Sequence, residues 1–369
     1  MLFYYLLLLI IGLDFVAEYF YTKKGEAIKR DKVKKALDFT FKYRLISIFA
    51  FVFLSTFKAD SIGCDTQTYI EWFNSWSYES DLGYSILQLI IFKIGFSYRG
   101  MWFVISIFIS VCVVLFINRF STNKLMSLLL YVSLGVFSQS LSFMRQIVAL
   151  GFLLLEIIAI DKKEWKKSAL FVFLASLFHR SGLIGLLFIA LKFIKINWKT
   201  ITAAIVIAVV FPLLLPYISK LIEKMGFPSY YHKYFVESTS FIRDTTLIAK
   251  LYSISLVVLF FAFYIVAECL KRKKEDFNKK TFYMLGIFLF AAMFKIMGVI
   301  LDANTLFDRL VVYFFHSLII IIPNLINEFK GNKKLYILAN VMCYIIAFAF
   351  LHGLYMINYY ETFPFIFGF

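Results

Sequence analysis

Residues 168–194, SALFVFLASLFHRSGLIGLLFIALKFI, decide how the chain is threaded through a membrane. The stretch is either one long span with His179 and Arg180 in its middle or a short helical hairpin with both residues at its tip. A single span would move the basic cluster KRKK at 271–274 to the side opposite the other basic loops, so we favour the hairpin. Its residues cover about 40 Å in total, which is too short for the tip to reach the far surface. We therefore expect His179 and Arg180 to be recessed within the outer half of the membrane.

The composition of the whole chain agrees with a membrane setting. Of its 369 residues, 62% are hydrophobic and 17% are charged, and the mean hydropathy is +0.81. Soluble domains are about half apolar and about a quarter charged, so a water-soluble enzyme, a disordered chain and a collagen-like chain are all excluded. We predict an all-α, polytopic integral membrane protein, with about twelve transmembrane helices in a single domain over residues 1–369.

Most of the chain divides into apolar segments of membrane-spanning length. The N-terminal segment lacks a preceding basic region and a cleavage site, so we expect a retained helix rather than a signal peptide. Segment 83–97 would reach only about 22 Å and carries Lys93, so we assign it as an interfacial or re-entrant helix in an outer loop over 59–100. The predicted spans are 2–20, 41–58, 101–118, 125–141, 142–160, 167–180, 182–194, 200–217, 246–267, 281–301, 309–329 and 335–357.

The basic residues orient these spans. With 83–97 not spanning, six loops that share one face hold 27 of the 39 Lys and Arg residues, and this face is then cytoplasmic. This pattern accounts for most of the net charge of +16, and no basic-aromatic surface module is present, so nucleic-acid binding is not expected. The four cysteines lie far apart without a CxxC or Cys/His cluster, so neither a structural zinc site nor a disulfide framework is expected. The six loops are 21–44, 119–124, 161–167, 192–199, 271–280 and 330–334.

Arginine is enriched on the outer side. Five of the nine arginines lie there, although the positive-inside rule predicts no such preference. For Arg99 and Arg243 we favour pairing with a local acid or contact with lipid headgroups. Arg145, Arg180 and Arg309 stand at helix ends within strongly apolar segments, where an idle charge is costly. Since the guanidinium fork suits phosphate oxygens, these three predict a site for a phosphate- or pyrophosphate-bearing ligand.

The first outer loop, residues 59–82, contains five acids, several aromatic residues and no Lys or Arg. Aromatic faces such as that of Trp72, together with carboxylates, suit sugar rings, although an interfacial aromatic belt explains the pattern about equally well. Asp65 and Tyr69 are four residues apart and share a helix face, so Asp65 could act as a general base on a sugar hydroxyl. A second long outer loop, 218–245, is polar and aromatic enough to cap a cleft.

Polar residues cluster at three further outer turns. Asp308 and Arg309 could equally form a structural pair, and His179 is as consistent with a packed core histidine as with a catalytic one. His316 lies deeper in its helix than Arg309 and is expected to pack. The polar residues of these turns are Gln139, Ser142, Arg145 and Gln146, then His179, Arg180 and Ser181, then Asp302, Asn304, Asp308, Arg309 and Tyr313.

A series of short motifs follows in order along the chain. It comprises GCDTQTY at 63–69, Gly83-Tyr84, Arg145-Gln146-x-x-Ala149, Phe178-His179-x-Ser181-Gly182, Arg309 with Tyr313-Phe314, and a C-terminus containing Tyr and Pro. Over roughly residues 45–365 this series resembles the EpsG-type branch of bacterial polysaccharide polymerases, which are similar in role to the Wzy polymerases of O-antigen and capsule synthesis. The chain has Cys64 where a varied polar residue is expected, and an arginine directly after His179.

The resemblance implies a GT-C-like glycosyltransferase of the bacterial cytoplasmic membrane that needs no metal or other cofactor. It would work at the outer face, moving a growing glycan from undecaprenyl pyrophosphate onto the next undecaprenyl-pyrophosphate-linked oligosaccharide. Membrane lipid and a chain-length regulator are the further partners expected. The catalytic candidates are Asp65, Arg145, His179 and Arg309, with either Asp65 or His179 as the base. The substrate-binding candidates are Tyr69, Trp72, Gln146, Arg180, Asp302, Asp308 and Tyr313.

Three other functions remain open at the level of sequence. A glycan ligase uses similar lipid donors and differs little in composition. A transporter or lipid-glycan flippase usually shows internal repeats and charges near the bilayer midplane, whereas Lys295 is the one strongly mid-span charge here. A membrane O-acyltransferase would need a recessed histidine, which His179 permits, but the arginines favour a pyrophosphate ligand. We therefore rank the polymerase first, the ligase second and transport third.

Overall fold

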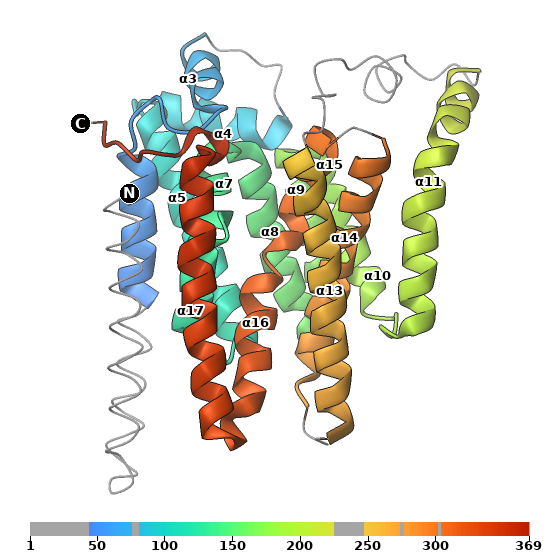
Figure 1. Cartoon of the computed structure of the whole chain (residues 1–369). Coiled ribbons are helices and arrows are strands. Elements are labelled where there is room, and N and C mark those ends of the chain that lie inside the picture. Colours follow the sequence, from blue (N-terminus) through green and yellow to red (C-terminus); the bar gives the residue numbers. More distant parts are fainter. Residues whose placement is uncertain (1–43, 76–80, 225–246, 274–276, 302–303, 369) are drawn as a thin grey trace, which may run out of the picture. The chain divides into compact units, whose positions relative to one another are not determined.

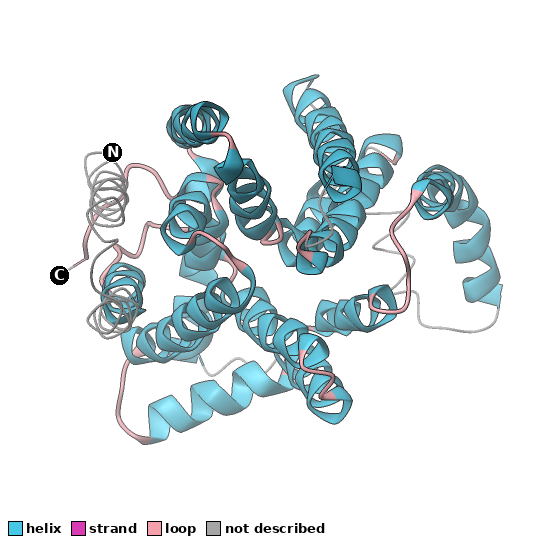
Figure 2. Ribbon diagram, turned by 90° about the horizontal axis from the view of Figure 1, so that it is seen from below, coloured by secondary structure: helices cyan, strands magenta, loops and turns pink. Residues whose placement is uncertain are grey.

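The computed structural model describes residues 44–75, 81–224, 247–273, 277–301 and 304–368. These residues form helices joined by loops, and no strand occurs among them (Figures 1 and 2). The predicted all-α class is therefore confirmed for this part of the chain. The chain divides into two compact units: unit 1 comprises residues 1–189 and 329–369, and unit 2 comprises residues 190–328. The predicted span 2–20 and the outer loop 218–245 lie wholly or mostly outside the described residues.

Unit 1 carries most of the short helices. Two elements cross its boundary with unit 2, namely α10 (Gly185–Leu191) and the 3-10 turn η3 (Glu328–Gly331). The others are a helix at Arg44–Thr56, α3 (Thr66–Ser75), α4 (Leu82–Lys93), α5 (Tyr98–Phe120), α6 (Lys124–Ser133), α7 (Val136–Ser142), α8 (Met144–Asp161), α9 (Trp165–Phe178), the 3-10 turn η1 (Arg180–Ile184), α17 (Lys333–Met356) and η4 (Tyr359–Glu361).

Unit 2 consists mainly of long helices. The helix α14 packs against α11, α13, α15 and α16, so it forms the centre of this unit. The helices are α11 (Trp198–Lys224), α13 (Leu247–Lys273), α14 (Lys279–Ile300), α15 (Asn304–Phe315) and α16 (Leu318–Asn327).

Six stretches of described helix are long and apolar enough to cross a membrane, which makes this a multi-pass membrane protein. The pair α6 and α7, bent by 54°, is a seventh if counted as one span. Each of the seven corresponds to a predicted span, whereas the total of about twelve and the GT-C-like architecture remain predictions. The six are Tyr98–Phe120, Trp198–Leu215, Lys250–Arg272, Lys279–Ile300, Phe307–Gly331 and Lys333–Met356.

The remaining predicted spans of unit 1 are shorter or more charged than expected. The helix at Arg44–Thr56 and α9 have fewer than 18 residues. The 18-residue α8 is apolar over most of its length but includes Arg145, Glu156 and Asp161. The segment predicted not to span is indeed short, since α4 has 12 residues and runs crosswise to α17 (Figure 1).

Two backbone breaks set the start of α8. Gly135 lies between α6 and α7 with φ +76, a left-handed conformation in which a side chain would also meet Leu354 and Tyr359. Phe143 then separates α7 from α8 with non-helical φ/ψ. The boundary predicted between spans 125–141 and 142–160 is therefore present, and it puts Arg145 in the first turn of α8.

The predicted break at the centre of residues 168–194 is also present. Helix α9 ends at Phe178, and His179 has extended backbone angles before η1 begins. The chain then folds back closely on α9. At Gly182 the approach is so close that a Cβ would lie 2.6 Å from the carbonyl carbon of Ala175. The sharp turn at His179 and Arg180 thus depends on small residues immediately after it.

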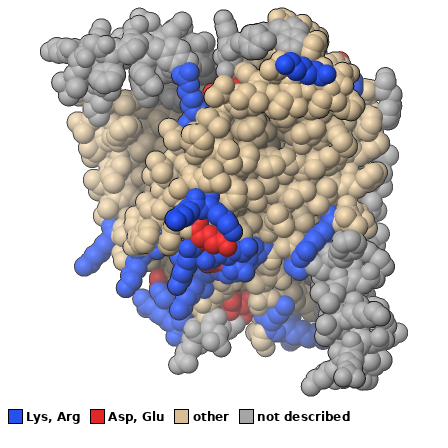
Figure 3. Space-filling model, turned by 180° about the vertical axis from the view of Figure 1, so that it is seen from behind, with Lys and Arg blue, Asp and Glu red and all other residues tan. Residues whose placement is uncertain are grey.

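The basic loops of unit 1 gather at one end of its helices. Arg119 near the end of α5 and Asp161 at the end of α8 form a salt bridge, so loops 119–124 and 161–167 lie together. On the face seen in Figure 3, most Lys and Arg side chains gather toward the lower end, below a broad surface without charge. This arrangement agrees with the predicted cytoplasmic side.

Candidate functional site

The first outer loop is anchored by Lys58, which is 1% exposed. Its Nζ donates to the Ile62 carbonyl at 2.7 Å, to Thr66 Oγ1 at 2.6 Å and to the Leu141 carbonyl at 2.6 Å. It also lies 4.7 Å from the centroid of the Trp102 ring. Since every hydrogen of this ammonium group has an acceptor, the buried charge is satisfied and pins the loop to the end of α7.

Glycine in the GCDTQTY motif has a steric role. Gly63 has φ +96, and a Cβ there would lie 2.6 Å from the Leu141 carbonyl oxygen. The turn delivers Asp65, half-buried, to the start of α3, and the Asp65 carbonyl accepts a hydrogen bond from the Tyr69 N–H. The motif therefore sets the position from which α3 points Tyr69 into the unit.

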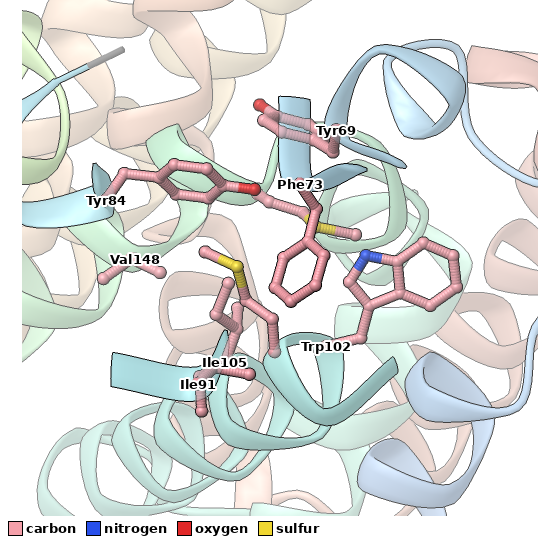
Figure 4. Packing of buried hydrophobic residues seen from close by; sticks show 9 residues of the cluster. Tyr69, Phe73, Tyr84, Ile91, Trp102, Ile105 and Val148 are labelled. Atoms are coloured by element: carbon pink, nitrogen blue, oxygen red, sulfur yellow. The ribbon is translucent and has the colours of Figure 1, made fainter. Parts of the chain in front are cut away.

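Tyr69 belongs to a buried aromatic cluster (Figure 4). Its ring lies 5.5 Å from that of Tyr84 on α4, and both residues are at most 4% exposed. Phe73 of α3 and Trp102 of α5 complete the centre of the cluster. Burial raises the pKa of Tyr69 above its ordinary value, the Arg145 charge opposes this rise and the Asp65 carboxylate adds to it.

The Gly83-Tyr84 and Phe178-His179 motifs meet through α4 and α9. A Cβ at Gly83 would lie 2.9 Å from the Phe178 ring, so only glycine allows α4 to approach this closely. Two of the short motifs that lie far apart in the sequence therefore pack together in unit 1.

Arg145 is the charged centre of this region. Its Nη1 donates to Asp81 Oδ2 at 3.1 Å, and its guanidinium lies 4.7 Å from the centroid of the Trp72 ring. The side chains of Arg145 and Asp81 are 25% and 12% exposed, so the pair is near the surface without being fully solvated. The backbone N–H of Arg145 lies 3.5 Å from the Tyr69 hydroxyl. Because Arg145 is the second residue of α8 and Asp81 immediately precedes α4, the N-terminal ends of these two helices meet here.

Asp81 faces a second arginine. Burial raises the pKa of the Asp81 carboxyl, and the charges of Arg145 and Arg180 offset part of that rise. The Arg180 backbone also contributes a hydrogen bond to this carboxylate, while its side chain is exposed. The charges of two arginines therefore act on one carboxylate, which Arg145 contacts through its guanidinium and Arg180 through its backbone.

The Arg145 guanidinium has unused donor capacity. Its Nε is buried and has no hydrogen-bond partner within the described part of the chain. A guanidinium has five N–H donors, and the bonds to Asp81 and to the Tyr69 hydroxyl leave some of them unused. An anion with several oxygens, such as a phosphate group, would supply acceptors that a single carboxylate oxygen does not.

His179 is held at the turn next to Arg180. Its Nδ1 lies 3.3 Å from the Ser181 backbone N and 2.6 Å from Ser181 Oγ. Since the Ser181 N–H donates to Nδ1, the proton of the neutral ring belongs on Nε2.

Several predicted site residues thus come together in unit 1. Tyr69 lies beside Arg145 and is reached by the charge of Asp65, and the Arg180 backbone bonds to Asp81, the partner of Arg145. Gln146 is buried, and the Trp72 ring carries the Arg145 guanidinium over one face.

Arg99 behaves as the sequence predicts. It pairs with the local acid Asp60 at 3.0 Å, and it also donates to two backbone carbonyls, those of Thr56 and Lys58. Arg243 lies outside the described residues.

The other predicted residues belong to unit 2. Asp308 of α15 accepts a hydrogen bond from Lys295 of α14, so the mid-span lysine has an acidic partner within this unit. Lys295 also lies 4.7 Å from the centroid of the Tyr252 ring. On the same helix Arg309 is half-buried and Tyr313 is fully buried. His316 is 1% exposed, in agreement with a packing role, and Asp302 lies outside the described residues.

Sequence reasoning missed Asp81 and Lys58. Asp81 was counted among the acids of the first outer loop but had no assigned role. Its place directly before an apolar helix is the signal for an N-cap, yet its side chain makes no cap hydrogen bond. Lys58 is the last residue of the predicted span 41–58, and its three acceptors are identifiable only from the fold.

A family model for EpsG proteins matches residues 41–367. The chain belongs to the EpsG family. This family is of the Wzy-like polysaccharide polymerase type, so the expectation drawn from the short motifs is confirmed at the level of family. Searches of curated proteins and of solved structures find no match for the chain. Membership of the EpsG family and the long apolar helices together indicate a multi-pass membrane protein with a role in polysaccharide synthesis.

Proposed function

We propose that this EpsG-family protein is a polysaccharide polymerase, a glycosyltransferase that joins undecaprenyl-pyrophosphate-linked oligosaccharide repeat units. It acts at the outer face of the bacterial cytoplasmic membrane, within a GT-C-like fold of about twelve spans, on substrates carried by membrane lipid. The main support for this proposal is the setting of Arg145. Its side chain is about three-quarters buried, it bonds Asp81 near Arg180, and its buried Nε has no partner in the described chain. A chain-length regulator is a further partner that this role implies.

The arginine cluster suits the departure of a lipid pyrophosphate. When the bond between the anomeric carbon and the pyrophosphate breaks, negative charge grows on the leaving oxygens. A preorganised guanidinium in a site shielded from water stabilises that charge. The start of α8 adds the positive end of a helix dipole to the charge of Arg145 itself. Arg309, a half-buried residue of unit 2, remains a catalytic candidate from the sequence.

The acceptor hydroxyl needs a base, and the local geometry favours Asp65 over His179 for this role. A carboxylate accepts a proton directly, and the charge of Asp65 reaches Tyr69, while within the described residues no bond to Arg145 holds Asp65 on the leaving-group side. His179 presents Nε2–H in its neutral form, because Nδ1 accepts the Ser181 N–H. That nitrogen donates a hydrogen bond, which suits a phosphate oxygen better than proton removal.

A glycan gel from living cells tests the function. Cells lacking the gene are complemented with the wild type or with the Arg145→Ala variant, and lipid-linked and surface glycans are separated by size. We expect a ladder with the wild type and single repeat units in both the null strain and the variant. Long polymer accumulating on its lipid carrier in the null strain would assign a glycan ligase instead. Repeat units trapped on the cytoplasmic leaflet would assign a flippase.

A further inference from the structure

We propose that Asp81 is a resident counter-anion, which occupies Arg145 and Arg180 between turnovers and is exchanged for the pyrophosphate of the lipid carrier. This inference rests on the proposed function and adds a positioning residue that the sequence motifs do not include. The exchange would hold the two arginines ready without leaving their charges uncompensated in a poorly solvated site.

The first support is the cap that Asp81 forgoes. Aspartate directly before a helix usually accepts a hydrogen bond from one of the first backbone N–H groups. Asp81 has the backbone angles of such a residue, φ −61 and ψ 142, but its side chain makes no cap hydrogen bond. The carboxylate instead turns to Arg145 at 3.1 Å. A local stabilising contact is thus given up for a contact with a residue 64 positions away in the chain.

The second support is the mismatch between donors and acceptors. The charges of Arg145 and Arg180 both act on one carboxylate, and the Arg145 bond to it is made through a single nitrogen. The buried Nε of Arg145 finds no partner among the described residues. A pyrophosphate brings more charge and more oxygens than Asp81, so it satisfies donors that the carboxylate leaves unused.

The third support is access. The side chains of Asp81 and Arg145 are 12% and 25% exposed, so an anion arriving from the surface can reach the pair. Asp81 immediately precedes the 12-residue α4, whose Gly83 packs against Phe178 next to the His179 turn. The carboxylate is therefore carried by the element that also contacts the Arg180 turn.

The geometry argues against Asp81 as the general base. In a displacement at the anomeric carbon, the attacking hydroxyl and the leaving pyrophosphate lie on opposite sides of the sugar. A carboxylate bonded to the arginine that holds the leaving group is on the leaving-group side. Its negative charge would instead compete with the pyrophosphate, which helps the lipid pyrophosphate to leave after transfer.

Titration with inorganic pyrophosphate tests the exchange directly. The full-length protein in lipid nanodiscs is compared as wild type, Asp81→Asn and Arg145→Ala, with Asp60→Asn as the matched control. Asp60 makes the corresponding bond to Arg99 at 3.0 Å. We expect Asp81→Asn to bind pyrophosphate about tenfold more tightly, since a charged competitor is removed without loss of side-chain volume. Asp60→Asn should bind as the wild type does, and Arg145→Ala should bind much more weakly.

A kinetic measurement separates exchange from a structural role. In Asp81→Asn we expect both KM and kcat for the lipid-linked substrate to fall, because substrate is held more tightly and product leaves more slowly. Asp81→Glu keeps the negative charge, so it should bind pyrophosphate as weakly as the wild type does. This variant also tests the exchange if Asp81→Asn fails to fold.

The two proposals fail in different ways. Pyrophosphate binding by Asp81→Asn that is unchanged or weaker, with Arg145→Ala still impaired, overturns the exchange and leaves the polymerase proposal intact. Wild-type binding by Arg145→Ala removes the anion site and the exchange with it. A normal glycan ladder in the null strain overturns the polymerase proposal and the lipid carrier as the source of the pyrophosphate, while an exchange of Asp81 for inorganic pyrophosphate would still be measured.

Discussion

Unit 1 contains two arginine–aspartate pairs that look alike at first sight. Arg99 bonds Asp60 at 3.0 Å and Arg145 bonds Asp81 at 3.1 Å. Arg99 also donates to the Thr56 and Lys58 carbonyls and lies over the rings of Tyr98 and Trp102. The Arg145 side chain contacts Asp81, the Trp72 ring and the Tyr69 hydroxyl, and its Nε has no partner in the described chain. Both arginines form a salt bridge, so the salt bridge does not distinguish them. The unused donors of Arg145 mark it as a candidate binding residue, whereas Arg99 has a structural role.

The two carboxylates differ in the same sense. Asp60 is 40% exposed and also accepts a hydrogen bond from the Tyr98 hydroxyl at 2.9 Å. Asp81 is 12% exposed, and burial raises the pKa of its carboxyl. Asp60 therefore completes a network that ties the loop to α5, whereas Asp81 pays a desolvation cost to stay beside its arginines.

The largest predicted effect comes from removing Arg145. We expect Arg145→Ala to lower the rate of glycan transfer about 100- to 1000-fold, the loss typical of removing one preorganised donor from a charge-stabilising site. Arg99→Ala is the matched variant and should keep transfer near the wild-type rate per folded molecule. Transfer is measured in membranes with lipid-linked repeat units. Equal losses in the two variants would remove the distinction between the pairs.

Lys58 supports the structural pair, since its carbonyl is one of the Arg99 acceptors. Lys58→Met removes three buried hydrogen bonds, although the Thr66 hydroxyl still donates to the Ile62 carbonyl, and we expect a loss of about 3 kcal/mol in the free energy of unfolding. Chemical unfolding in detergent measures it, with Lys93→Met on the exposed side of α4 as the control. Unchanged stability would show that the buried ammonium does not anchor the outer loop.

Replacing each arginine by lysine sharpens the comparison further. Lysine keeps the charge but loses the planar fork, so Arg145→Lys should weaken pyrophosphate binding by about 1–2 kcal/mol. The same exchange at Arg99 should leave pyrophosphate binding unchanged, because its donors serve the backbone and Asp60. Full binding by Arg145→Lys would mean that charge alone is sufficient at this site.

The pH dependence of pyrophosphate binding should arise from the Arg145–Asp81 pair and not from the Arg99–Asp60 pair. As the pH falls through the raised pKa of Asp81, the carboxylate is neutralised and stops competing for Arg145 and Arg180. Binding to the wild type should therefore tighten toward low pH relative to Asp81→Asn, which also corrects for titration of pyrophosphate itself. Tyr69 and Tyr84 face the same cluster, and burial raises the pKa of both, so they stay neutral in this range. A parallel dependence in both proteins would contradict the role of Asp81.

The smallest predicted effect concerns Trp72. Its ring carries the Arg145 guanidinium, and a cation–π contact of this kind is worth about 0.5–1 kcal/mol. Trp72→Leu should lower the transfer rate about threefold to fivefold through Arg145. A loss as large as that of Arg145→Ala would indicate that Trp72 contacts the sugar directly.

The sequence predicted those features that depend on local pattern. The apolar segments, the break at His179 and the local pairing of Arg99 follow from composition and from neighbours in the chain. The ordered short motifs predicted that Tyr69 and Arg145 belong to one site, and they lie together.

Features that depend on tertiary contact were not predictable in this way. Asp81 and Arg145 are 64 residues apart, and the position of Asp81 directly before a helix predicts a cap rather than a salt bridge. The pairing of Lys295 with Asp308 likewise joins two helices of unit 2. The sequence offered Asp308 and Arg309 as a pair, because adjacency along the chain is visible and packing between α14 and α15 is not.

Pyrophosphate binding to Arg145→Ala and Arg99→Ala, measured side by side on folded protein in nanodiscs, tests the central claim most directly. If unused donors define the site, Arg145→Ala loses binding and Arg99→Ala keeps the wild-type affinity. Loss of binding in Arg99→Ala, or wild-type affinity in Arg145→Ala, would contradict the assignment of the anion site to the Arg145–Asp81 pair.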